Sequence, residues 1–205
     1  MTLIQLLSPN FPIGAFAYSH GLEWAIETEL IQTGQSLQNW LTDLVELGSA
    51  RTDAVILART ILGDNAKDLN ELALSLCASS ERITELQNQG AAFCKTLNDV
   101  WEIKLENFTL PVAIGLAARR HRLDVAMVLP AYLHAFCSNL ISTAIRTIPL
   151  GQSQGQRILL NLHQSISKIS KQAEVSKTED ITSCCFLSDV ASMKHNKLEP
   201  RIFKT

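Results

Sequence analysis

Apolar residues recur along most of this chain at the spacing of an amphipathic helix. In the stretches 37–48, 83–97, 128–145 and 155–173 they return every three or four positions, which places them on one face of an α-helix. The best candidate for a strand, AVILA at 54–58, lies in a segment that also fits a helix, and no Asn-Gly or Asp-Gly dipeptide marks a hairpin turn. The periodicity therefore predicts an all-α fold.

Polar residues mark where several of these helices should begin. Ser36 and Asp124 can act as N-caps, and Ser80 with Glu81 supplies a polar start for a third helix. The helix after Asp124 carries large apolar residues on one side and small residues on the other, so it should pack on two faces near the centre of a bundle. Shorter helices are expected at about 15–30, 52–62, 66–79, 111–120 and 187–193.

Neither an internal repeat nor a long linker interrupts the chain, which favours a single domain. We expect a helical bundle over residues 1–193, with a loop segment at its N-terminus. Residues 194–205 differ, because four basic residues face one glutamate and give this segment a formal charge of +3, against −5 for the rest of the chain. We expect this basic tail to be flexible and to become ordered when a partner binds.

The composition narrows the class of protein. With 46% hydrophobic and 19% charged residues the chain can bury a sizeable core, and a formal net charge of −2 argues against a dedicated nucleic-acid binder. The apolar stretch 125–137 falls short of the roughly 20 residues that span a bilayer. No basic, apolar leader begins the sequence, so we expect a cytoplasmic protein without membrane contact. Five cysteines are an odd number, and a disulfide framework is not expected.

Motifs typical of catalysis are missing from the sequence. It contains no phosphate-binding loop, dinucleotide fingerprint, HExxH, CxxC or GxSxG motif, so we predict no catalytic residues, no cofactor and no enzyme activity. Three cysteines fall on apolar stripes and are expected in the core, namely Cys77, Cys94 and Cys137. Cys184 and Cys185, with His195 ten positions on, are weak candidates for a metal site, because adjacent cysteines chelate one ion awkwardly. Loop cysteines are the simpler interpretation.

Three segments are unusual for a plain bundle. Residues 8–27 combine prolines, glycines and aromatic side chains, which suits either a close-packed interface or a buried junction between loop and helix. Residues 145–156 contain a Pro-Leu-Gly-Gln turn, which is either a helix–helix connection or a functional surface. The basic run ARRHR at 118–122 can complement the C-terminal end of a helix dipole or bind a protein partner.

Together these segments resemble the UreF family of urease accessory proteins. The resemblance is carried by LSPNFPIGAFAYSHGLEWAIE at 7–27, RTD at 51–53, AYLHAFCSNLISTAIRTIPLGQSQGQ at 131–156, LSDVASMKH at 187–195 and RIFKT at 201–205. Residues 54–109 match in helical character alone. The tail departs from the family pattern HETQYSRLFRS, since HNKLEPRIFKT keeps His195, Arg201 and Phe203 but replaces residues 196–200.

The resemblance implies a non-catalytic, all-α protein that acts in urease maturation. UreF-like proteins form dimers and join UreD (called UreH in some species) and the GTPase UreG on the urease apoprotein. Nickel is then inserted in a step linked to GTP hydrolysis, and modulation of the GTPase is a further role implied for the family. The missing phosphate loop agrees with a GTP site that belongs to UreG.

The same resemblance suggests residues for partner binding. They are Tyr18, His20 and Glu23 near the first helix, Arg146 and Gln152 around the Pro-Leu-Gly-Gln turn, and Arg201 and Phe203 in the tail. Tyr18 can equally belong to the core, and Arg146 can equally cap the end of its helix. An alternative function is that of a metallochaperone that binds nickel directly through His195 and the pair Cys184 and Cys185.

Overall fold

All regular structure in the computed structural model is helical, and the model describes residues 1–205. The α-helices are α1 (Thr2–Leu6), α2 (Leu22–Glu27), α3 (Gly34–Glu46), α4 (Ser49–Leu62), α5 (Ala66–Ser75), α6 (Ser80–Trp101), α7 (Leu110–Arg120), α8 (Val125–Thr147), α9 (Gln152–Val175) and α10 (Phe186–His195). Two 3-10 turns, η1 (Ala15–Ala17) and η2 (Thr178–Asp180), complete the set. The predicted all-α fold is confirmed, and AVILA at 54–58 lies inside α4.

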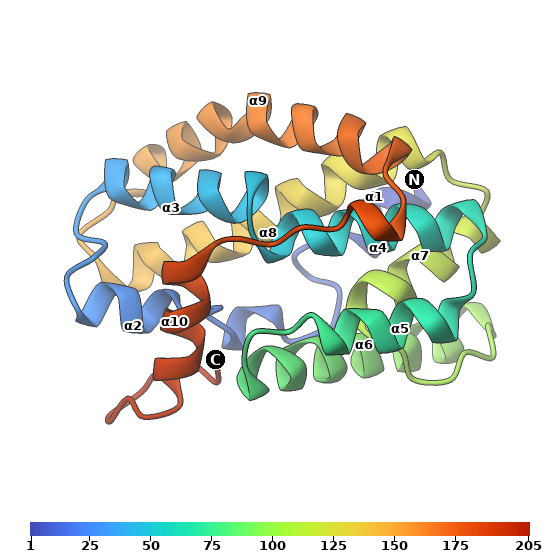
Figure 1. Cartoon of the computed structure of the whole chain (residues 1–205), viewed down its shortest axis with the longest axis horizontal. Helices are drawn as coiled ribbons and strands as arrows, with labels where there is room; N and C mark the ends of the chain where they lie inside the picture. The colour runs from blue at the N-terminus through green and yellow to red at the C-terminus, as the bar shows by residue number, and fades with distance from the viewer.

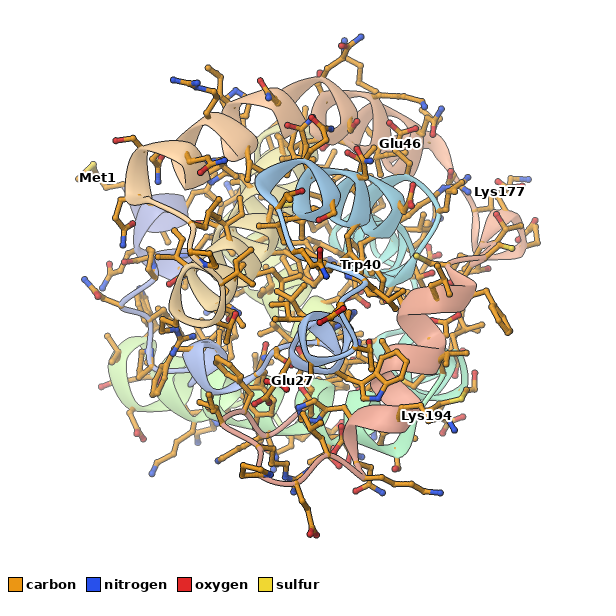
Figure 2. The ribbon with its side chains drawn as sticks, turned by 90° about the vertical axis from the view of Figure 1, so that its left-hand side faces the viewer. Met1, Glu27, Trp40, Glu46, Lys177 and Lys194 are labelled. Carbon is orange, nitrogen blue, oxygen red and sulfur yellow. The ribbon has the colours of Figure 1, made fainter.

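Two central helices, α4 and α8, organise the bundle. Helix α8 packs against α9, α4, α3 and α2, as its two apolar faces predicted, and α4 also contacts α7, α3 and α5. Figure 1 shows α9 along the top beside α3, with α5 and α6 below and α2 and α10 grouped at one end. One cluster of 41 buried apolar residues forms the main core, and a smaller cluster of four joins α5 to α4 and α7 through Ile56, Leu69, Ala73 and Val112. Trp40 of α3 turns toward this interior in Figure 2.

The helix starts follow local hydrogen-bonding chemistry. The Asp124 side chain accepts a hydrogen bond from the Ala126 N–H at 3.0 Å and caps α8 as predicted. The predicted start of α3 is three residues too late. Thr33 is the N-cap, and Ser36 is its partner in a capping box. Helix α6 is capped by Ser79, which accepts from the Arg82 N–H.

The single helix expected at 15–30 is wrong. The chain there forms the short turn η1, an extended link and then α2, and its glycines explain the break. Gly14 and Gly21 have φ values of +69° and +77°, which favour glycine over residues with a side chain. A Cβ on Gly21 would also lie 2.7 Å from the backbone N of Ser192, so the missing side chain lets α10 pack closely at the start of α2.

The expected flexible tail is not what the structure shows. Residues 196–205 turn back from α10 and pack on α2, η1 and α6, with Phe203 and Thr205 buried. Figure 1 shows this segment returning from α10 to the C-terminus. Its ordering depends on buried carboxylates that belong to α2 and α6, and the composition of the tail alone contains no information about them. The N-terminal segment likewise contains a short helix, α1, before its loop.

Helix α8 has the length and composition that a membrane-spanning segment would need. The sequence prediction counted only the apolar stretch 125–137, whereas the whole helix runs for 23 residues through Pro130, because proline is tolerated near a helix start. Within the fold, four other helices surround α8 and take up its apolar faces. Its hydrophobicity is therefore that of a central core helix.

Candidate functional site

The C-terminal residue of α10, His195, is fully buried between two carboxylates. Its Nε2 lies 2.8 Å from Glu23 Oε2, and its Nδ1 lies 2.8 Å from Glu81 Oε2. Carboxylates act only as acceptors when ionised, so both contacts are satisfied when both ring nitrogens carry hydrogen. Figure 2 shows the neighbouring Lys194 at the end of α10 that lies beside α2. His195 thus joins α2, α6 and α10.

The two carboxylates also hold the C-terminal segment. Glu23 accepts hydrogen bonds from the backbone N–H groups of Ile202 at 2.6 Å and Phe203 at 3.1 Å. The remaining oxygen of Glu81 accepts from Arg201 Nη1 at 2.8 Å. We call these five residues the C-terminal clasp: Glu23, Glu81, His195, Arg201 and Phe203. Charge-assisted hydrogen bonds of this kind are about twice as strong as neutral ones, which explains why this part of the chain is held in place.

Beyond the clasp, the last residues lie alongside η1. The Lys204 N–H donates to the Ala17 carbonyl at 2.8 Å, and the Ser19 N–H donates to the Thr205 carbonyl at 2.7 Å. The Ser19 hydroxyl donates to the same carbonyl. The segment therefore pairs with the N-terminal part of the chain through backbone hydrogen bonds, which do not depend on side-chain identity.

Arg146, near the end of α8, covers the buried ring of Phe203. Its guanidinium carbon lies 4.8 Å from the ring centroid, within the range of a cation–π contact. The same guanidinium donates to the Phe16 carbonyl at 3.0 Å. Arg146 also donates to the Ser142 carbonyl, which lies one turn back within α8 and is not among the last carbonyls that a C-terminal cap would satisfy. It connects α8 to η1 and to the tail.

A second group of buried polar side chains lies next to the clasp, and we call it the α6 network: His20, Asp53, Arg82, Glu85 and Tyr132. Arg82 pairs with Asp53 at 2.5 Å and with Glu85 at 3.2 Å. His20 places Nδ1 3.1 Å from Glu85 Oε2 and Nε2 2.7 Å from Ser49 Oγ. The Tyr132 hydroxyl donates to Asp53 at 2.9 Å. These contacts tie the link that precedes α2 to α4, α6 and α8.

Charges within the α6 network shift its protonation equilibria. Burial alone would raise the pKa of Glu85, but the charges of Arg82 and His20 outweigh it and lower the pKa to about 2. For Arg82, Asp53 and Glu85 likewise outweigh the effect of burial and raise its pKa. Burial, followed by the charge of Asp53, raises the pKa of Tyr132 well above its ordinary value. At neutral pH Glu85 is therefore ionised and paired with the Arg82 guanidinium.

Six of the seven partner-binding candidates come together around these two groups. Glu23, Arg201 and Phe203 belong to the clasp, Arg146 covers Phe203, and His20 belongs to the α6 network. Tyr18 is buried, accepts a hydrogen bond from Asn88 at 3.2 Å, and has the Lys204 amine 5.9 Å from its ring centroid. Gln152 lies apart from them, exposed at the start of α9.

Sequence reasoning missed the charged residues that α6 contributes. Glu81, Arg82 and Glu85 lie on the same face as Leu86 and Phe93, which is the buried face of the helix. Charged residues that fall in line with an apolar stripe are the signal that could have found them, because buried charges are rarely left unpaired.

The weak metal candidates do not meet in the structure. Cys185 precedes α10 and His195 ends it, a separation of about 15 Å along a helix that rises roughly 1.5 Å per residue. Both nitrogens of His195 already face carboxylates. Cys184 is exposed, whereas burial raises the pKa of the half-buried Cys185 to about 11. Of the core cysteines, Cys94 and Cys137 are buried as predicted, and Cys77 is half-buried.

Taken together, the fold and the clasp define an all-helical protein whose buried ionisable groups bind its own C-terminal segment. Comparison with known proteins specifies the class further. The sequence profile of the UreF family matches residues 31–163. Proteins named urease accessory protein UreF from Cereibacter sphaeroides, Ruegeria pomeroyi and Roseobacter denitrificans are 45%, 39% and 38% identical to the whole of this chain, which covers 98%, 96% and 93% of their lengths. The chain belongs to the UreF family of urease accessory proteins.

Proposed function

We propose that this protein is a urease maturation factor. It acts as a scaffold that links UreD (UreH) and the GTPase UreG on the urease apoprotein during GTP-dependent nickel insertion. The observation that carries this proposal is the similarity to urease accessory proteins along the full chain, at up to 45% identity in the relatives described above. A cytoplasmic location and a homodimeric state form part of the proposal.

The surface around the clasp supports a role in binding other proteins. The side chains of Phe16 in η1 and Ile202 in the tail are 70% and 77% exposed. Their backbones are nevertheless held in place, because Arg146 donates to the Phe16 carbonyl and the Ile202 N–H donates to Glu23. Arg201 is partly exposed and pairs with Glu81 from one side only. Exposed apolar side chains beside an arginine are typical of protein interfaces. The clasp fixes them in one arrangement, which lowers the entropy loss on binding.

Co-purification tests the proposal. The untagged protein, co-expressed with UreD (UreH) and tagged UreG, should be recovered in a ternary complex, and its absence would refute the scaffold role. Arg201→Ala should reduce recovery without changing the helical content measured by circular dichroism. Lys197→Ala is the matched control, because Lys197 is an exposed basic residue of the same segment outside the clasp. Equal recovery of the two variants would remove Arg201 from the interface.

Modulation of the GTPase is a finer part of the same proposal. The rate of GTP hydrolysis by UreG, measured with and without this protein, should change if the scaffold acts on the nucleotide cycle. An unchanged rate in a complex that still forms would restrict the protein to assembly.

A further inference from the structure

Two histidines face each other across the contact between α8 and α9. The ring centroids of His134 and His163 lie 5.9 Å apart, and the ring planes are inclined by 44°. Both side chains are exposed, and neither makes a hydrogen bond or an ion pair with another protein group. This arrangement differs from that of His20 and His195, whose ring nitrogens are all engaged by polar side chains.

The separation of the two rings suits a single bridging ion. A Zn–N bond is about 2.0–2.1 Å long and lies in the plane of the imidazole, so two rings on one ion have centroids roughly 4.5 Å apart at a right angle and about 5.2 Å apart at the tetrahedral angle. The observed 5.9 Å is slightly longer, so the two rings need to turn a short way toward each other to share one ion. Rotation of exposed side chains can adjust the ring planes without moving the backbone, since such rotations are fast and inexpensive.

The ring nitrogens of the pair are available as ligands. Imidazole binds a metal ion in its neutral form, through the lone pair of a ring nitrogen. Because no protein group occupies the ring nitrogens of His134 and His163, both exposed side chains can offer such a donor.

The backbone around the pair is well supported. Helices α8 and α9 are the longest in the protein and pack along each other, as Figure 1 shows. Gly155 lets them approach closely, because a Cβ there would lie 2.7 Å from the Cδ1 of Ile145. The two imidazoles are thus held on a rigid frame, which raises the effective concentration of the second ligand once the first has bound.

We propose that His134 and His163 form a surface site for a divalent first-row transition-metal ion that favours imidazole, such as Ni²⁺. The protein supplies two nitrogen ligands, and water fills the remaining positions, so the bound ion stays accessible and exchangeable. Imidazole suits nickel, copper and zinc, and excludes magnesium and calcium, which prefer oxygen. This site is separate from the clasp, and the proposal does not depend on a role in urease maturation.

Isothermal titration of the untagged full-length protein with NiCl₂ tests the site. We expect one ion per chain for the wild type, and His134→Gln or His163→Gln should each weaken binding by about tenfold or more, because each removes one arm of the chelate. Ni²⁺ should raise the midpoint of thermal unfolding of the wild type and leave that of the double variant unchanged, since a ligand stabilises only the state that binds it. Glutamine favours helix, so these exposed substitutions preserve the fold.

Cys184→Ser is the control, because Cys184 is another exposed potential ligand that lies outside the pair. It should leave Ni²⁺ binding unchanged. The proposal is overturned if the wild type fails to bind Ni²⁺ at millimolar concentration, or if the histidine variants bind as the wild type does. Loss of binding in Cys184→Ser with retention in both histidine variants also overturns it, and would indicate a site at the start of α10.

Discussion

Glu23 and His195 are separated by 172 residues in the chain, yet their side chains meet at 2.8 Å in the interior. The same Glu23 carboxylate accepts two backbone hydrogen bonds from the tail, so a single side chain of α2 fixes both α10 and the segment that follows it. Removing His195 would leave the buried Glu23 carboxylate without its side-chain partner. This dependence makes the clasp the most sensitive point of the C-terminal part of the fold.

His195→Ala should lower the free energy of unfolding by about 3–5 kcal/mol, because it leaves Glu23 and Glu81 buried without their shared partner. Urea denaturation followed by circular dichroism measures the change. His163→Ala is the control, since His163 is exposed and unpaired, and should change stability by no more than about 0.5 kcal/mol. Similar effects of the two substitutions would mean that the buried contacts of His195 contribute nothing to stability.

Phe203→Ala should loosen the tail. Phe203 is 3% exposed under Arg146, and truncating a buried phenylalanine costs about 3–5 kcal/mol. Hydrogen exchange measured by mass spectrometry should then increase at residues 196–205. Ile202→Ala serves as the matched control. The Ile202 side chain is next to Phe203 in the sequence but 77% exposed, so its removal should leave hydrogen exchange unchanged. Protection that persists in Phe203→Ala would show that backbone pairing alone holds the segment.

Acid should destabilise the protein partly through Glu85. Its pKa is about 2 in the folded protein and 4.5 ordinarily, so the unfolded state takes up the proton first as the pH falls. Stability from this group is complete above about pH 4.5 and is lost between there and about pH 2, at up to roughly 1.4 kcal/mol per pH unit. Urea midpoints measured across this range should fall less steeply for Glu85→Gln. An unchanged slope would exclude Glu85 as a source of the acid sensitivity.

Gly21→Ala should destabilise the protein more than Gly14→Ala does. Both glycines have positive φ, so an alanine at either position carries a conformational strain of about 1–3 kcal/mol. Only at Gly21 would the added Cβ also meet the backbone of α10, at 2.7 Å, whereas nothing lies within 4 Å of a Cβ at Gly14. The difference between their unfolding free energies therefore measures the close approach of α2 and α10. Equal losses would show that α10 moves aside freely.

Several helices could be predicted from the sequence because their information is local. The stripe after Asp124 and the cap that begins it define α8 within a few residues, and the amphipathic pattern after Gly151 defines α9. The break between η1 and α2 was missed, although Gly14 and Gly21 were visible, because a glycine does not reveal from sequence alone whether its φ is positive. The need for a residue without a side chain at Gly21 comes from the packing of α10 against it, which only the tertiary structure shows.

The contacts of the clasp could not be predicted from the sequence either. Glu23, Arg201 and Phe203 were selected by resemblance as residues that bind other proteins, and that role stays a prediction. Their positions in the structure are instead explained by contacts with their own chain. Glu81 was interpreted only as a polar helix start, because nothing near it in the sequence indicates that His195 lies 114 residues further on and packs beside it.

By itself the sequence determined the helical class, the approximate helices and, through motifs spread along the chain, the family. These properties follow from the periodicity of side chains around a helix and from short segments that can be compared directly. The tertiary structure decided that the basic tail is packed, that buried carboxylates hold it and that His134 faces His163. Pairings between residues far apart in the chain depend on how helices are arranged in space, and that arrangement is set by the packing of the whole core.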